Sequence, residues 1–160
     1  MDQPLGLLLA FVALVAVLFG LFASLGAFFP RWVWLSQRAA EQSPGRSLLI
    51  GSVNAAFVLA ISLPLLSLEG PLATLLGALV LALGTGALAI GLAAVASLVG
   101  RRLRRSESEL SSILTGTVVL SLGSAVPFLG WFVFLPGVIF LGLGACILGW
   151  FRRRAWSGQL

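Results

Sequence analysis

The stretch SSILTGTVVLSLGSAVPFLGWFVFLPGVIFLGLGACILGW, residues 111–150, runs for forty residues without a charged side chain. As one straight helix it would be about 60 Å long, twice the roughly 30 Å thickness of the hydrocarbon core of a bilayer. The stretch therefore has to turn back on itself. Pro127 and Gly130 favour a break in its middle, because proline removes a helix donor and glycine accepts turn conformations.

Two arrangements of this stretch remain open. Residues 131–150 predict about 28 Å of helix, with Trp131 and Trp150 at its ends, where indoles favour the membrane interfaces. Residues 111–126 make only about 24 Å of helix, which is short for a full crossing. We expect a helical hairpin, with a shallower re-entrant element as the alternative. Pro136 and Gly137 offer a second break.

The composition indicates an integral membrane protein. Hydrophobic residues make up 59% of the 160 residues, and the mean hydropathy is +1.11, which leaves too little polar surface for a soluble globule. Cys146 is the single cysteine and there is no histidine, so we expect no disulfide, metal site or other cofactor. The net charge of +5 favours anionic lipid headgroups as partners, and no nucleic acid is expected.

The remaining apolar segments cover residues 5–29, 48–67 and 72–100. We expect a single transmembrane domain over residues 1–160, an all-α bundle of three long spans plus the carboxyl-terminal element broken at Pro127 and Gly130. The first segment is interpreted as a retained span, because a secretory signal has a basic start and a shorter apolar stretch. A polar connector over residues 30–47 is expected to begin at the level of the headgroups.

All ten basic residues are arginines, and their positions predict the topology. If residues 111–150 crossed the membrane once, seven arginines would lie on one side and three on the other; a turned-back stretch puts all ten together. The positive-inside rule favours the second arrangement, with the amino terminus outside and the carboxyl terminus cytoplasmic, in a prokaryotic inner membrane. The expected interface anchors are Trp32, Trp34, Trp131, Trp150, Arg101, Arg102, Arg104, Arg105, Arg152, Arg153 and Arg154.

Small residues are frequent and often lie four apart, as in Ala87 and Gly91. This spacing lets helices approach closely, either within one chain, which we favour, or between chains of an oligomer. The expected packing residues are Gly86, Gly91, Gly116, Gly123, Gly142, Gly144 and Asn54. The Asn54 amide could line a polar site, but a hydrogen bond across to a neighbouring helix is the favoured interpretation.

The segments LFASLGAFFPRW, SPGRSLLIGSV, LVGRRLRR and TGTVVLSLGSAVPFLGWFVFLPGVIFLGLGACILGWFRRR resemble the integral-membrane domain of bactofilin-type, polymer-forming bacterial and archaeal proteins. The positions that fill its closing pattern are Gly116, Leu120, Leu122, Val126, Pro127, Leu129, Gly130, Gly142, Leu143, Gly144 and Ala145. The soluble β-helix of that family is missing here, so the resemblance does not imply filament formation. The turn SLEGP also stands where the family pattern predicts a more apolar Thr-Gly-Pro segment. The resemblance implies a membrane domain without assigned chemistry.

No reaction can be read from the sequence, because an intramembrane enzyme needs a nucleophile with a base, paired acids or metal ligands. Glu69 lies in the turn SLEGP, which predicts a solvated loop residue. We expect a non-enzymatic membrane module that self-associates or serves as an accessory or scaffold subunit. The alternative is a small channel or transporter that uses the broken VPFLG element, for which Ser121 and Ser124, together with Thr115 or Thr117, are the available polar lining.

Overall fold

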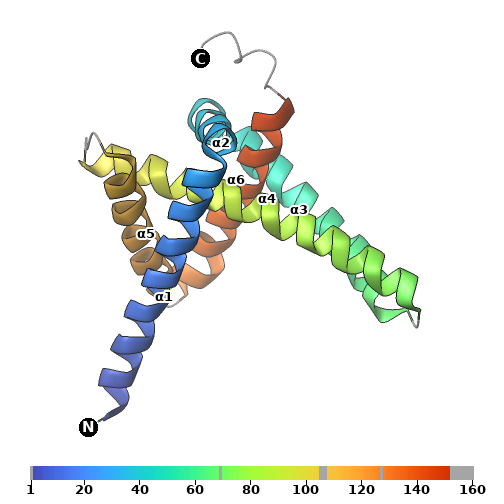
Figure 1. Ribbon diagram of the computed structural model, residues 1–160, viewed down its shortest axis with the longest axis horizontal. Helices are drawn as coiled ribbons and strands as arrows, with labels where there is room; N and C mark the ends of the chain where they lie inside the picture. The colour runs from blue at the N-terminus through green and yellow to red at the C-terminus, as the bar shows by residue number, and fades with distance from the viewer. Residues whose placement is uncertain (1, 69, 105–107, 127, 152–160) are drawn as a thin grey trace.

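The computed structural model describes residues 2–68, 70–104, 108–126 and 128–151 (Figure 1). Within these ranges the chain is helical and contains no strand, which confirms the expected all-α fold. The helices in chain order are α1 (Asp2–Phe28), α2 (Pro30–Gln42), α3 (Pro44–Ser67), α4 (Pro71–Arg104), α5 (Glu109–Ala125), the π-helical turn η1 (Gly130–Phe134) and α6 (Leu135–Phe151).

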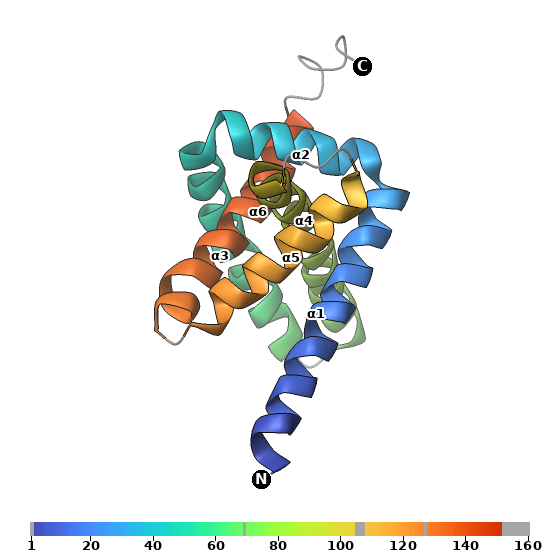
Figure 2. The ribbon, with the colours of Figure 1, turned by 90° about the vertical axis from the view of Figure 1, so that its left-hand side faces the viewer.

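Prolines mark the beginnings of three helices. Pro30 and Pro44 lie in the first turn of α2 and α3, and Pro71 is the first residue of α4. Proline lacks a backbone N–H, which the first turn of a helix does not need. The chain changes direction at these points, so that α2 lies across one end of the bundle while α1 and α6 run towards it (Figure 2).

Within the described residues, four helices are long and apolar enough to cross a membrane. They cover Leu9–Phe28, Pro44–Ser67, Pro71–Leu103 and Gly130–Phe151. The helix α5 is shorter, because its apolar part reaches only from Leu110 to Ala125. At about 1.5 Å per residue it falls short of the hydrocarbon thickness of a bilayer.

The helix α2 occupies most of the region that the sequence suggested as a polar connector. Its buried residues are Val33, Leu35, Ser36, Gln37, Ala39 and Ala40. Four of them, at positions 33, 36, 37 and 40, follow the i, i+3, i+4, i+7 spacing of one helix face. This amphipathic helix packs against α4 and α6, so the connector is part of the folded bundle.

Small side chains form the centre of the bundle. The helix α6 packs against α2, α3 and α4, and α4 also packs against α5 and α1. Ala93, Ala94, Ala96 and Ala145 are completely buried in these contacts. Because alanine and glycine let helix backbones approach closely, the bundle is held by close helix contacts and few large core side chains.

The first half of α4 pairs with α3 to form an arm that projects away from α1 and α5 (Figure 1). We call this pair of segments the α3–α4 arm. The amino terminus and the turn between α3 and α4 both lie away from α2 (Figures 1 and 2). The arm leaves many of its apolar side chains exposed.

Candidate functional site

Four tryptophans were expected at the membrane interfaces, and the structure divides them between the two ends of the molecule. Trp32 and Trp34 lie on α2. The Trp32 ring meets the Trp150 ring edge to face, with ring centroids 6.1 Å apart. Trp131 lies in η1, at the other end of the continuous helix η1–α6, and its side chain is exposed.

The described arginines gather at one end of the molecule. Those with described side chains are Arg31, Arg38, Arg46, Arg101 and Arg102, and Arg104 is the last residue of α4. The Arg102 Nη2 atom lies 3.8 Å from the Glu41 Oε1 atom, which brings the last turn of α4 next to α2. We call this side of the molecule the arginine end. Among the expected anchors, Arg105, Arg152, Arg153 and Arg154 lie outside the described residues.

The glycines expected at helix contacts lie mostly where two backbones of the same chain meet. A side chain at Gly91 of α4 would overlap the carbonyl oxygen of Gly142 on α6. A side chain at Gly116 of α5 would likewise overlap the carbonyl oxygen of Ala96 on α4. Neither position has room for a methyl group, so α4 contacts both α5 and α6 through bare backbone.

The helix α3 approaches α6 in the same way, because Gly144 lies against the carbonyl oxygen of Ser47. Three further glycines, Gly51, Gly100 and Gly149, stand against the backbone of a neighbouring helix. None of these three glycines was among the packing residues expected from the sequence, although Gly100 and Gly149 each follow an alanine by four positions. Glycine is common throughout these apolar helices, so spacing alone does not separate the two kinds of position.

Two of the expected packing residues do not make the contacts expected of them. The Asn54 Nδ2 atom donates to the Ile50 carbonyl oxygen of its own helix at 2.8 Å, not to a neighbouring helix. An amide can reach the carbonyl one turn earlier, which satisfies one of its donors without a partner helix. Gly86 faces open space, since no atom lies within 4 Å of the position that a Cβ would take there.

The helical structure is interrupted between α5 and η1, as the sequence predicted. The helix α5 ends at Ala125, and Phe128 has a φ of 63°, in the left-handed region that non-glycine residues rarely adopt. Gly130 then begins η1 and is buried against the last turn of α5. Pro127, the other residue expected at the break, lies outside the described residues.

Past the break the chain stays helical to Phe151. The ring of Phe134 in η1 lies against Gly123 of α5, another of the expected packing positions. Pro136, proposed from the sequence as part of a second break, lies instead in the first turn of α6. The wider π turn before it shifts the hydrogen bonding by one residue, so the helix continues through this proline.

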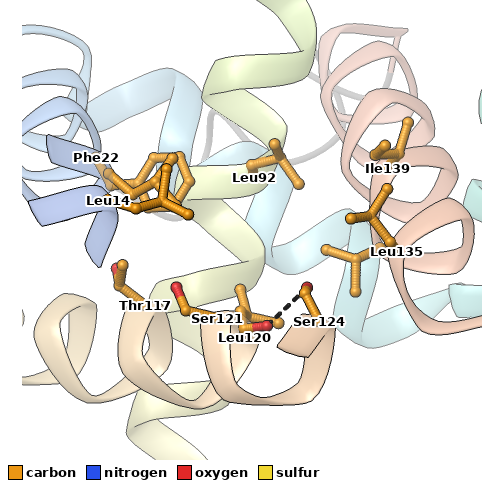
Figure 3. A pocket seen from close by; sticks show the side chains of 11 residues that line it. Leu14, Phe22, Leu92, Thr117, Leu120, Ser121, Ser124, Leu135 and Ile139 are labelled. Atoms are coloured by element: carbon orange, nitrogen blue, oxygen red, sulfur yellow. Dashed lines mark hydrogen bonds between the residues drawn. The ribbon is translucent and has the colours of Figure 1, made fainter. Parts of the chain in front are cut away.

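A cavity of about 260 Å³ lies beside the break, between α1, α4, α5 and α6 (Figure 3). Thr117, Ser121 and Ser124 line it from α5, and its other lining residues are apolar, so we call it the hydroxyl cavity. The Thr117 and Ser124 hydroxyls donate to carbonyl oxygens of their own helix, at 2.8 and 2.9 Å. The Ser121 hydroxyl points away from α5 towards the cavity (Figure 3).

A buried polar contact joins α2 to α4. The Gln37 side-chain amide donates to the Ser97 hydroxyl, which itself donates to the Ala94 carbonyl oxygen at 2.9 Å. Both side chains are buried. The amphipathic spacing of α2 could have marked Gln37 as buried, whereas nothing in the apolar run around Ser97 distinguishes that serine.

The spanning helices, the small-residue core and the amphipathic α2 define a multi-pass α-helical membrane protein. Comparison with protein-family models, curated proteins and solved structures finds no match to the chain. The arginine end and the hydroxyl cavity are two places where described polar residues line a pocket.

Proposed function

We propose that the chain is a non-enzymatic membrane module that associates with further copies of itself, or serves as an accessory or scaffold subunit. One observation carries this proposal: Ala82 and Gly86, two small residues four apart, lie uncovered on the α3–α4 arm, and we call this pair of positions the notch. Both residues are exposed, and a Cβ at Gly86 would meet nothing within 4 Å. Small residues four apart let a second helix approach the backbone closely, which is how many membrane helices associate.

The apolar surface around the notch supports this proposal. Leu75 and Leu83 of α4 are 68% and 67% exposed. Lipid chains can cover such leucines as well as a protein can, so these side chains alone do not select a protein partner. The notch favours a protein partner, because a rigid helix can fit closely against small residues and gain van der Waals contact there.

Filling the notch tests the proposal. We expect the purified chain to form an associated species, or to retain a co-purifying subunit, in mild detergent. The variant Gly86→Leu should lose this association, as measured by analytical ultracentrifugation. Gly137→Leu is the matched control, because Gly137 on α6 is also open but has the larger residues Val133 and Leu141 four positions away. A wild-type chain that is a solitary monomer without a partner would contradict the proposal.

The composition supports a non-enzymatic role, since the chain has no histidine and one cysteine. The resemblance of this chain to the bactofilin-type membrane domain agrees with it, because no chemistry is assigned to that domain. Purified protein with a catalytic activity that survives removal of any associated subunit would contradict a purely structural role.

We further propose that the arginine end faces the cytoplasm of a prokaryotic cell and that the amino terminus lies outside. The positive-inside rule supports this orientation, because it places arginine-rich segments on the cytoplasmic side. A cysteine-free Cys146→Ala background permits a direct test with single cysteines. A membrane-impermeant maleimide added to intact cells should label Thr74→Cys, near the turn between α3 and α4, but not Gln42→Cys at the end of α2. The reverse pattern would refute the orientation.

A second candidate, a small channel or transporter, is favoured by the hydroxyl cavity beside the break. Three hydroxyl-bearing residues of α5 line this cavity, and transporters bind substrates at discontinuous helices. If this function holds, Ser121→Phe should abolish solute flux in liposomes, whereas Thr85→Val in the arm should leave it unchanged. Liposomes without flux would remove this candidate.

A further inference from the structure

The arginine end contains a hollow of about 420 Å³ between α2 and the end of α4. Arg38 contributes to it from α2, and Arg101 and Arg102 contribute from α4. Glu41 is the only acidic residue among the described residues of its lining. Among the described side chains of this lining, three guanidinium groups stand around one carboxylate, an excess of positive groups that suits an anion with two negative charges. We call it the arginine hollow.

The carboxylate in the hollow is weakly engaged. Arg102 Nη2 and Glu41 Oε1 are 3.8 Å apart, and the two side chains are 67% and 55% exposed. Exposed ion pairs of this kind contribute little to the stability of a protein, because water and salt screen them. An incoming anion can therefore replace Glu41 at Arg102 with little loss of free energy.

The lining of the hollow holds the Arg38 side chain in place and includes an apolar surface. The Arg38 guanidinium carbon lies 4.3 Å from the centroid of the Trp34 ring, a cation–π contact that holds it on the wall. Leu98 of α4 and the Trp34 ring supply apolar lining. A ligand with both a phosphate group and an apolar body matches this combination, because guanidinium groups bind phosphate oxygens in a bidentate geometry.

We propose that the arginine hollow binds the headgroup of an anionic phospholipid, and that it prefers a headgroup with two negative charges. The inference rests on the insertion of the spanning helices in a bilayer, which puts α2 at the level of the headgroups. It does not depend on self-association or on which side of the membrane the arginine end faces. The hollow then differs from an ordinary basic surface, because α2 and α4 together hold its charges around one place.

Glu41 gives the proposal its sharpest test. If Glu41 only holds Arg102 in place, then Glu41→Gln should weaken lipid binding or leave it unchanged. If an anion competes with Glu41 for Arg102, the same substitution should tighten binding. A basic residue near an anionic membrane surface contributes about 1 kcal/mol to the free energy of binding, which is about fivefold in affinity. Removal of one negative charge from the hollow should therefore tighten lipid binding about fivefold.

The experiment uses the full chain in a neutral detergent, with bound lipids counted by native mass spectrometry. The probes are diphosphatidylglycerol with two negative charges, phosphatidylglycerol with one, uncharged phosphatidylcholine and water-soluble inorganic pyrophosphate. We expect affinity to fall in the order diphosphatidylglycerol, phosphatidylglycerol, phosphatidylcholine, with pyrophosphate weaker than diphosphatidylglycerol. Equal binding of pyrophosphate and diphosphatidylglycerol would overturn the lipid as the ligand, and equal binding of all three lipids would overturn the site.

Two double variants separate the arginine hollow from general surface charge. Arg101→Gln with Arg102→Gln should weaken diphosphatidylglycerol binding about 25-fold, at about fivefold per arginine. Arg31→Gln with Arg46→Gln removes the same charge from exposed positions outside the hollow and should change binding less than about twofold. Equal losses in both would overturn the proposal. If the Arg101→Gln, Arg102→Gln variant fails to fold, the Glu41→Gln variant decides the question. Tighter binding of diphosphatidylglycerol to that variant supports the proposed lipid site, and unchanged or weaker binding overturns it.

Discussion

Gly91 of α4 and Gly142 of α6 meet backbone to backbone, so that a side chain at Gly91 would occupy the space of the Gly142 carbonyl oxygen. Five residues earlier on the same helix, Gly86 faces open space. Both residues are glycines of α4, but Gly91 contacts another helix and Gly86 does not. They therefore form a matched pair for testing the packing of the bundle.

We predict opposite effects for Gly91→Ala and Gly86→Ala. The first places a methyl group against backbone that cannot yield without moving a helix, so the free energy of unfolding should fall by about 1–3 kcal/mol. The second adds a better helix former at an open position, which should raise it by up to about 1 kcal/mol. Reversible unfolding in detergent, under conditions that keep the protein monomeric, measures both. Equal effects would show that α4 and α6 do not meet at Gly91.

The contact between Gln37 and Ser97 predicts a rescue by a second substitution. Ser97→Ala leaves the buried Gln37 amide without its acceptor and should lower the free energy of unfolding by about 1–2 kcal/mol. Addition of Gln37→Leu removes the amide that Ser97→Ala leaves without a hydrogen bond, so the double variant should recover most of the lost free energy of unfolding. Thr85→Ala is the control, since the exposed Thr85 hydroxyl bonds only within its own helix. A double variant less stable than Ser97→Ala alone would argue against the contact.

Cys146 reports on the packing of α6. Its side chain is buried, with 8% exposure, and it is the single cysteine of the chain. A thiol reacts only when a reagent can reach it, so maleimide should modify the folded protein far more slowly than the protein unfolded in denaturant. Gly91→Ala should speed the reaction and Gly86→Ala should not. Rapid modification of the folded wild-type chain would show that the α6 interface is open.

The left-handed backbone at Phe128 predicts a stabilising substitution. Phe128→Gly should raise the free energy of unfolding by about 1 kcal/mol, because glycine adopts this conformation without the penalty of a side chain. Phe132→Gly is the matched control: its ring stacks on that of Phe128, with centroids 6.5 Å apart, so both variants lose the same ring contact. The control places glycine inside η1 and should be destabilising by a similar amount. Loss of stability in both variants would contradict the strain at Phe128.

The sequence was sufficient for features that depend on local chemistry. The apolar composition predicted an all-α membrane protein, and Pro127 with Gly130 predicted a break that the structure has between α5 and η1, although the left-handed conformation falls on Phe128 and not on Gly130. A missing proline N–H and the lack of a glycine side chain act on the chain within one turn. The same local reading missed that residues 30–42 form a packed helix, because their many polar residues hid an amphipathic period.

Only the tertiary structure decided which residues meet. Gln37 and Ser97 lie sixty positions apart and share one hydrogen bond, and Arg38 joins Arg101 and Arg102 around one hollow. In a soluble helix the apolar face would point to the core, but lipid is as apolar as a protein interior, so hydrophobicity does not distinguish the two faces of a spanning helix. Sequence alone therefore determined that this chain enters a membrane and where it breaks. The tertiary structure determined that Gly91 is packed while Gly86 is open, because α6 fills the space beside Gly91 and no atom fills the space beside Gly86.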